Sequence, residues 1–369
     1  MTTTTRKKIL FVLHTPPPVH GAAMVGKTIQ DSHAINDAFD CRFINLSTST
    51  TVESVGRFSL KKIGSVFSLR RRIRKAIREY HPDLVYYTPS ATGFAFWKDC
   101  LITRSIKGTG TPVVYHFHNK GVSTKQDSGC YDRAYRRFFS GAKVMLLAET
   151  LYDDMKQYVS RDQLLICGNG IADVERKMDN RNDHDVPQVL FLSNLITEKG
   201  VLVLLDACQK LKEKGITFSC HIVGSETEEI DSVRIRQEID NRGLNSIVEY
   251  LGKRYGKEKE VEYDRSDFFV FPTFYAKECF PIVLLEAMQH GLPCISTCEG
   301  GIADIVDDGV TGLLAHRRDA DDLAAKMATL ISDTALRKKM GAEGRRKYER
   351  MYTLQSFEQN MISCLKQVL

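Results

Sequence analysis

Two glutamates stand eight positions apart in the stretch Glu278-Cys-Phe-Pro-Ile-Val-Leu-Leu-Glu286. The apolar run Phe268-Phe-Val-Phe271, which comes shortly before, is typical of a buried strand, and a loop leads from it to Glu278. The spacing predicts a helix that opens near Phe280 and carries Glu286 about two turns in. Strand, loop and helix together indicate an α/β domain with two carboxylates at the carboxyl end of one strand.

This position in the fold is suited to a ligand. In open α/β sheets, ligands bind outside the carboxyl ends of the strands. The free backbone N–H groups at the start of a helix suit a diphosphate, and a carboxylate one or two turns further on suits ribose hydroxyls. The spacing alone fits equally well an amphipathic helix with two solvated acids, so the surrounding motifs decide between the two interpretations.

Four further segments accompany this stretch in the second half of the chain. They are Phe191-Leu-Ser-Asn-Leu-Ile-Thr-Glu-Lys-Gly200, His221-Ile-Val-Gly224, Val248-Glu-Tyr-Leu-Gly252 and residues 293–314, which contain Gly300-Gly301. Together with the two glutamates, these segments resemble, in the same order, the signature of retaining GT-B glycosyltransferases of family 4, the group 1 glycosyl transferases. Five motifs in one order, across about a third of the chain, are far more specific than any one of them.

The resemblance implies an α/β protein of the GT-B fold, with two doubly wound, Rossmann-like domains that face each other across a cleft. Repeated strand and helix patterns in both halves agree, because βα units form parallel sheets with helices on both faces. We expect an acceptor-binding domain at residues 1–172 and a nucleotide-sugar-binding domain at residues 187–353, joined by a polar linker. By resemblance, a C-terminal helix at about residues 354–369 packs back on the first domain.

Hydrophobic patterns locate the individual elements. Strands are predicted at residues 9–13, 41–46, 84–87, 113–117, 144–148, 164–167, 189–192, 218–223, 247–251, 268–271 and 294–296. Helical patterns cover residues 22–36, 60–80, 131–139 and 200–214.

Composition is that of a globular protein large enough for two domains. The chain has 369 residues, of which 43% are hydrophobic and 27% charged. No apolar run approaches the roughly 18 residues that span a bilayer. Ten cysteines are scattered without a Cys-x-x-Cys pair, which is typical of reduced thiols in the cytoplasm. Because no His, Cys or Asp cluster has metal-ligand spacing, we expect neither a metal nor a cofactor.

Charge is divided unevenly between the two halves. The first 170 residues contain 25 Lys and Arg against 13 Asp and Glu, and the rest contain 27 against 33. Residues 60–80 combine apolar positions at helical spacing with many cations, and the candidates for a membrane or acceptor surface are Arg70, Arg71, Arg72, Arg74 and Lys75. Such a helix can lie on an anionic membrane, or it can be a surface helix with a solvated face. Aromatic residues are too sparse here to favour nucleic acid. We therefore expect a cytoplasmic protein, with a peripheral position on the inner face of the membrane left open.

The stretch Gly21-Ala-Ala-Met-Val-Gly26-Lys27-Thr28 matches the P-loop pattern. Two features argue against a P-loop: residues 15–20 separate it from the first strand, and no strand ending in Asp offers a convincing metal-binding partner. By resemblance, Gly21 belongs instead to a glycine loop that lines the cleft and allows the backbone close approach to the donor. Lys27 would then be a surface helix residue.

The resemblance also assigns the remaining site residues. His118 and Glu278 are the candidate catalytic residues, and His116 is expected to be structural. The candidate donor-binding residues are Gly21, Asn194, Lys199, Gly224, Phe280, Ile282, Val283 and Glu286. A lysine near a helix start opposes the helix dipole unless an anion such as a diphosphate is present. Asn194 stands where the family usually has arginine, so Lys199 carries more of the charge neutralisation.

These assignments imply a metal-independent, retaining transferase of the hexosyltransferase type. It would move a sugar from a nucleoside diphosphate sugar, UDP-sugar being favoured over GDP-sugar, to a hydroxyl of a lipid-linked or growing glycan in cell-surface polysaccharide synthesis. Three alternatives remain: a nucleotide-sugar epimerase on the same scaffold, which needs no acceptor, a P-loop NTPase through residues 21–28, and a non-catalytic sugar-binding module.

Overall fold

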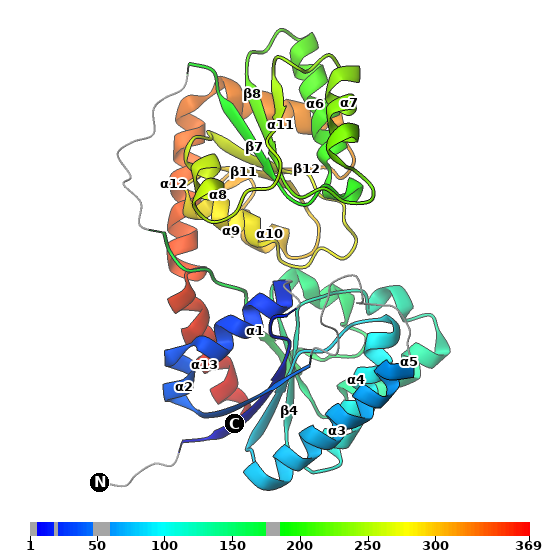
Figure 1. The fold of residues 1–369 in the computed structure, drawn as a ribbon. Helices are drawn as coiled ribbons and strands as arrows, with labels where there is room; N and C mark the ends of the chain where they lie inside the picture. Colours follow the sequence, from blue (N-terminus) through cyan, green and yellow to red (C-terminus); the bar gives the residue numbers. More distant parts are fainter. Residues whose placement is uncertain (1–5, 18–20, 47–59, 175–184) are drawn as a thin grey trace, which may run out of the picture. The chain divides into compact units, whose positions relative to one another are not determined.

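A computed structural model describes residues 6–17, 21–46, 60–174 and 185–369 of the chain. The chain divides into two compact units (Figure 1). Met1–Asn169 and Gln355–Leu369 form the first unit, and Gly170–Leu354 form the second. The first unit ends at Asn169, close to the expected boundary at residue 172, whereas the second unit begins at Gly170, well before the expected residue 187. Most of the expected polar linker lies outside the described residues.

The first unit contains a parallel sheet with the strand order β2-β1-β3-β4-β5-β6. Its strands are β1 (Lys8–Leu13), β2 (Asp40–Asn45), β3 (Leu84–Tyr87), β4 (Val113–Phe117), β5 (Lys143–Leu146) and β6 (Leu164–Ile166). Every residue of β3 and β4 is buried, as is all of β1 after Lys8. Nearly continuous burial of this kind is expected where helices cover both faces of a sheet.

Helices lie on both faces of this sheet (Figure 1). One face carries α1 (Gly21–Asp31), α2 (His33–Ala38) and α13 (Leu354–Val368), and the other carries α3 (Leu60–Tyr80), α4 (Gly93–Lys107) and α5 (Gly129–Phe139). The chain steps from β1 to β2 in one direction across the sheet and from β2 towards β6 in the other. Because crossovers between parallel strands are right-handed, connections in opposite directions place their helices on opposite faces. On the second face, α4 contacts both α3 and α5.

The C-terminal helix α13 belongs to the first unit although the chain passes through the second unit before it. Glu358 of α13 accepts a hydrogen bond from the Ser32 hydroxyl at 2.6 Å. Asn360 donates to the backbone oxygen of Ile166, at the end of β6, at 3.3 Å. Both contacts join α13 to parts of the chain that come before the second unit.

The second unit contains another parallel sheet, with the strand order β12-β11-β10-β7-β8-β9. Its strands are β7 (Gln188–Leu192), β8 (Ser219–Val223), β9 (Val248–Tyr250), β10 (Phe268–Phe271), β11 (Cys294–Thr297) and β12 (Gly312–Ala315). The chain leaves β7 towards β8 and leaves β10 towards β11, on the opposite side. Because β7 and β10 are neighbours, the topological switch point of this sheet lies between them.

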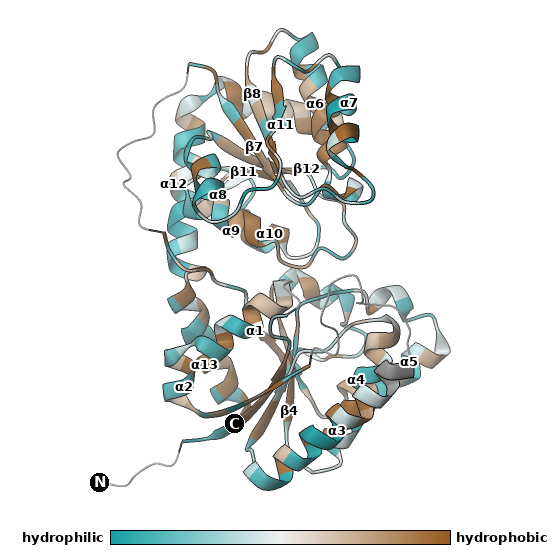
Figure 2. Cartoon of the chain, viewed as in Figure 1, coloured by the Kyte–Doolittle hydropathy of each residue, from teal (hydrophilic) through white to brown (hydrophobic). Residues whose placement is uncertain are grey.

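Helices also cover the second sheet. They are α6 (Val201–Glu213), α7 (Ser232–Asn241), α8 (Lys257–Asp264), α9 (Ile282–Gln289), α10 (Ile302–Ile305), α11 (Ala320–Ser332) and α12 (Thr334–Met351). Helix α6 contacts α7 and α11, while α9 contacts α12. Figure 2 shows hydrophobic residues gathered in the strands, whereas α3 and α12 carry many hydrophilic residues. The two sheets therefore form the core of their units.

The predicted fold class is confirmed, since both units are parallel sheets with helices on both faces. Every predicted strand forms, with its ends shifted by two residues at most. The helix predicted at residues 22–36 is wrong as one piece, because Ser32 interrupts it: the Ser32 hydroxyl accepts from the Ile35 N–H at 3.1 Å and caps α2. Helix α4 was not predicted. Its first turns contain glycine and aromatic residues of low helix propensity, so tertiary packing forms it.

Two glycines of α1 differ in their surroundings and allow a test of how tightly this helix packs. A Cβ atom at Gly26 would overlap the backbone oxygen of His14 at the end of β1, whereas a Cβ at Gly21 would meet nothing within 4 Å. We predict that Gly26→Ala lowers the free energy of unfolding by about 1–3 kcal/mol through overpacking. The matched variant Gly21→Ala should change it by less than about 1 kcal/mol. Urea denaturation measures the free energy of unfolding of both variants. If Gly26→Ala and Gly21→Ala were equally stable, α1 could shift on the sheet without loss of stability.

Candidate functional site

An ion pair spans the switch point of the second sheet. Lys199 ends the short 3-10 helix Thr197–Lys199, which follows β7, and Glu278 lies in the loop after β10. The Lys199 Nζ atom is 2.6 Å from a carboxylate oxygen of Glu278, and the two side chains are only 15% and 9% exposed. The sequence predicted both as site residues, but it did not predict that they bind each other. Removing one partner of such a buried pair leaves the other charge uncompensated.

Aromatic rings and close backbone contacts hold this pair in place. The Lys199 ammonium lies 4.7 Å from the centre of the Tyr275 ring. Gly200 adopts a φ of 89°, and a Cβ there would overlap the backbone oxygen of Pro272. Gly300 packs equally close to the backbone oxygen of Glu278. A side chain at position 200 would therefore push apart the two loops that carry the pair, and one at position 300 would push the loop after β11 away from Glu278.

Helix α9 begins later than the sequence predicts. It starts at Ile282, after Pro281, whose backbone is extended with a ψ of 114°. A residue before proline is disfavoured in the helical region, so Phe280 cannot open the helix as expected. Phe280 is buried instead, with its ring centre 5.9 Å from that of Tyr352. The N–H groups of Ile282 and Val283 are in the first turn, where no helical carbonyl can accept them.

Glu286, on α9, is held by two residues of α8. The Lys259 Nζ atom lies 2.5 Å from one carboxylate oxygen, and the Tyr263 hydroxyl donates to the other at 3.0 Å. Tyr263 is buried and stacks on the His290 ring, with centres 5.1 Å apart. Sequence reasoning missed Lys259 and Tyr263. Their spacing of four residues, which puts them on one face of a helix, was the available signal.

Asn194 and Gly224 follow the neighbouring strands β7 and β8. A Cβ at Gly224 would overlap the backbone oxygen of Ser193, so glycine is required for the two strand ends to pass each other. The Asn194 side chain is exposed, and its backbone oxygen accepts from the Ile196 N–H at 2.8 Å. Both residues thus lie at the same edge of the sheet as Lys199, and a role in donor binding remains a prediction for each.

In the first unit, two histidines at the end of β4 have different partners. His116 is fully buried, with Nδ1 2.6 Å from the Tyr86 hydroxyl and Nε2 3.2 Å from the Cys167 oxygen. Burial lowers the pKa of His116 to about 4. Burial, and then the neighbouring His116 and His14, hold the pKa of His118 well below its usual range. Both imidazoles are therefore neutral near pH 7, and His118 can donate one hydrogen bond and accept one. Sequence reasoning missed His14.

Residues 174–347 match the family model described as glycosyl transferases group 1. The matched segment covers nearly all of the unit that contains Lys199, Glu278 and Glu286. This second unit belongs to the group 1 glycosyl transferases.

The amylovoran biosynthesis glycosyltransferase AmsK of Erwinia amylovora is 26% identical to this chain over 239 residues, which cover 63% of this chain and 58% of AmsK. This chain therefore spans less than two thirds of the length of this relative. The glycosyltransferase structure from Rickettsia africae ESF-5 superposes with a TM-score of 0.77 at 19% identity, covering 98% of both chains. The structure of Anabaena Alr3699/HepE in complex with UDP-glucose gives a TM-score of 0.71 at 19% identity, covering 98% of this chain and 100% of that one. These likenesses establish the fold, which is GT-B.

The P-loop alternative does not fit the structure of residues 21–28. Residues 21–28 form helix α1 from the first glycine onward, whereas a P-loop needs an irregular loop whose N–H groups surround phosphates. Lys27 forms an ion pair with Asp31 at 2.6 Å on the helix surface. The Thr28 hydroxyl donates to the Met24 oxygen at 3.1 Å. Neither side chain is placed to hold a nucleotide and a metal.

The predicted basic helix forms with the expected bounds as α3. Arg71, Arg72, Arg74 and Lys75 are exposed, as a surface role requires. Arg70 is an exception, because it is half-buried and its Nε donates to the Ser105 hydroxyl of α4. Arg70 therefore contributes to the packing of α3 on α4.

Two further features of the described residues concern metals and membranes. No group of three or more His, Cys, Asp or Glu residues among them lies close enough to hold a metal ion. None of the helices formed by these residues is both long and apolar enough to cross a membrane.

Proposed function

We propose that the protein is a retaining glycosyltransferase that moves a hexose from a nucleoside diphosphate sugar to a hydroxyl of a glycan or lipid-linked acceptor. The observation that supports this most is the gathering of Lys199, Glu278, the first turn of α9 and the anchored Glu286 at one edge of the second sheet. A UDP-sugar is the favoured donor, in keeping with the ligand named for HepE. The name of AmsK supports polysaccharide synthesis as the setting.

The donor diphosphate would bind by an exchange of partners at Lys199. In the structure, Glu278 neutralises the Lys199 ammonium at 2.6 Å. A diphosphate carries more negative charge than a carboxylate and accepts charge-assisted hydrogen bonds, so it competes for the same cation. The N–H groups of Ile282 and Val283 at the start of α9 add further donors. Once released, Glu278 can accept hydrogen bonds from the hydroxyls of the transferred sugar, which replace the donor that its carboxylate gives up at Lys199.

The nucleoside part would be held by Glu286. A carboxylate accepts both hydroxyls of a ribose, provided that its oxygens are fixed in position. Lys259 and Tyr263 supply that positioning, since each binds one carboxylate oxygen. Asn194 can add a neutral hydrogen bond to the donor where an arginine would add a charge.

Transfer would depend mainly on stabilising the departing diphosphate. Donors that are already aimed at the developing charge need no reorganisation during the reaction, and they do not require a metal. Lys199 and the α9 amides would supply them. The neutral imidazole of His118 would donate a hydrogen bond to a sugar hydroxyl or to the reacting centre.

The direct test is a screen of UDP- and GDP-sugars by thermal shift, followed by an assay for transfer or slow hydrolysis. A ligand at 100 times its dissociation constant stabilises the folded protein by about 2.7 kcal/mol. Conversion of one nucleotide sugar into another, with no acceptor present, would identify an epimerase instead. Donor binding without transfer or hydrolysis would identify a sugar-binding module.

The two neighbours of Glu286 lead to a graded prediction. Glu286→Ala should abolish most nucleoside diphosphate affinity, while Tyr263→Phe should weaken it by roughly fivefold, because one hydrogen bond to the carboxylate is lost at about 1 kcal/mol. A matched control is Tyr348→Phe, since the Tyr348 hydroxyl bonds to Ile171 and Gln289. Calorimetry with UDP measures all three. Equal affinity in the wild type and Glu286→Ala would remove Glu286 from the donor site.

Lys199 and metal ions give a second prediction. Lys199→Ala should lower the transfer rate by at least about 100-fold, because it removes the side-chain cation assigned to the departing diphosphate. EDTA should leave the wild-type rate unchanged. If EDTA abolishes transfer and Mg²⁺ restores it, a bound metal performs the neutralisation assigned to Lys199.

The exposed cations of α3 give a third prediction, which also tests a peripheral membrane position. Each cation near an anionic surface contributes about 1 kcal/mol, and salt screens this attraction. Replacing Arg71, Arg72, Arg74 and Lys75 by Gln should therefore reduce sedimentation with anionic vesicles at low salt. Hydrolysis of the donor should stay intact.

A matched control removes the same number of exposed cations from the second unit. Its four Gln substitutions are at Lys214, Lys253, Lys257 and Lys339. This control should bind vesicles like the wild type. Failure of the wild type to bind anionic vesicles at low salt would make α3 a solvated surface helix and favour a soluble acceptor.

A further inference from the structure

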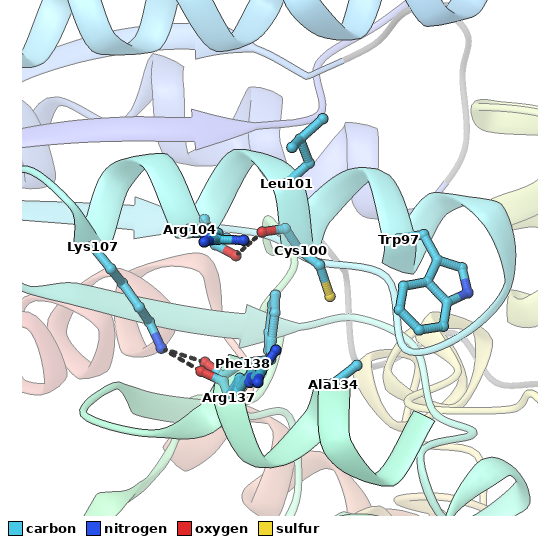
Figure 3. Close-up of a pocket in the computed structure, with 9 residues that line it drawn as sticks. Trp97, Cys100, Leu101, Arg104, Lys107, Ala134, Arg137 and Phe138 are labelled. Carbon is cyan, nitrogen blue, oxygen red and sulfur yellow. Dashed lines mark hydrogen bonds between the residues drawn. The ribbon is translucent and has the colours of Figure 1, made fainter. Parts of the chain in front are cut away.

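A cavity of about 560 Å³ lies between α4 and α5 in the first unit (Figure 3). Its size is within the range of small-molecule sites. Trp97, Cys100, Leu101 and Ala134 give it apolar walls. None of the residues assigned above to donor binding lines this cavity, which we call the α4–α5 groove.

Apolar and cationic side chains are separated along the α4–α5 groove. Trp97 lies in the second turn of α4, and Arg104 lies in its last turn. Arg137 lies likewise in the last turn of α5. Both helices connect parallel strands, so they run in the same direction, and their last turns meet at one end. The seven residues from Trp97 to Arg104 correspond to about 10 Å at 1.5 Å per residue. One end of the groove is therefore cationic and the other aromatic.

Lys107 lines the cationic end, but its ammonium group is already bound to backbone oxygens and is not available to a ligand. Its Nζ donates to the backbone oxygens of Phe138 at 2.6 Å, Ser140 at 2.7 Å and Arg137 at 3.2 Å, as Figure 3 shows for two of them. These contacts cap the carbonyl groups at the end of α5, which would otherwise repel an anion. All three ammonium donors are engaged in this way.

Arg104 and Arg137 are the cations that remain available. Both side chains are exposed, and neither forms an ion pair with any acid in the described part of the chain. A guanidinium can bind a phosphate or carboxylate through two parallel N–H groups, so two of them form a strong anion site.

The aromatic end is unusually open for such large side chains. The exposed fractions are 41% for Trp97 and 46% for Phe94, one turn before it. Contacts with Phe96 and Tyr131, at ring-centre distances of 5.6 and 5.1 Å, hold the Trp97 indole in place. Exposed aromatic groups beside a cavity mark surfaces that bind apolar partners.

We propose that the α4–α5 groove binds a single-chain anionic amphiphile. Its phosphate or carboxylate head lies between Arg104 and Arg137, and the first part of its chain follows Leu101 towards Trp97. Charge complementarity at one end and apolar walls at the other select this class of ligand over a free anion or a neutral lipid. The proposal is independent of the donor chemistry assigned to the second unit.

Trp97 makes the test direct, because it is the only tryptophan of the chain. The full-length protein is titrated with dodecyl phosphate below its micelle concentration, and tryptophan emission is recorded. We expect a saturable blue shift as the chain covers the indole. Inorganic phosphate, which is the head alone, and dodecyl maltoside, which has the same chain with a neutral head, should each bind at least tenfold more weakly.

Variants test the contribution of each end of the groove to binding. Arg104→Gln with Arg137→Gln should weaken dodecyl phosphate binding at least tenfold, while the matched double variant Lys125→Gln with Arg133→Gln should bind like the wild type. Ala134→Phe fills the apolar part and leaves both arginines, so it should abolish binding of dodecyl phosphate. Thermal unfolding shows whether each variant is folded.

Three outcomes would overturn the proposal. Equal affinity for dodecyl maltoside would mean an apolar patch without an anion site, and equal affinity for inorganic phosphate would mean a plain anion site. A blue shift of Trp97 emission with vesicles of phosphatidylcholine and phosphatidylglycerol, but not with monomeric dodecyl phosphate, would mean that the aromatic end binds a bilayer surface.

Discussion

The ion pair between Lys199 and Glu278 is the interaction on which the second unit's site depends. It joins the loops that follow β7 and β10, the two strands at the switch point of the sheet. Two largely buried charges can lie there only because each neutralises the other. Gly200 lets the backbones of these two loops come close together, and Gly300 lets the loop after β11 pack on the backbone of Glu278. In the proposed function, a diphosphate takes over the Lys199 ammonium while sugar hydroxyls donate hydrogen bonds to the Glu278 carboxylate in its place.

Support for the site comes from elements outside the recognisable motifs. Glu286 belongs to the motif, but its carboxylate is oriented by Lys259 and the buried Tyr263 of α8. In the proposed site this positioning would favour binding of a ribose, because a group already held in place loses little entropy on binding. Glu286, which the family motif singles out, thus depends on residues outside the motif for its orientation.

The first unit differs from the second in its chemistry. It carries the excess positive charge, much of it on α3 and at the cationic end of the α4–α5 groove, together with two neutral histidines at the end of β4. Surface cations and an amphipathic groove suit partners that are anionic and partly apolar. The second unit suits a compact, highly charged nucleotide. Two units of the same architecture therefore present different surfaces, because their side chains at the strand ends and helix faces differ.

Local patterns in the sequence were enough for the α/β fold class, for every strand except β12 and for the bounds of α3, while the family resemblance singled out Lys199, Glu278 and Glu286. Periodicity and the glycine signals act over a few neighbouring residues, so they can be read without coordinates. The tertiary structure decided which charges meet. Lys199 and Glu278 are 79 positions apart, and nothing local indicates their pairing or the packing of Arg70 on Ser105. It also decided where α9 starts and that α4 forms at all. Long-range packing selects among states that local propensity leaves close in free energy.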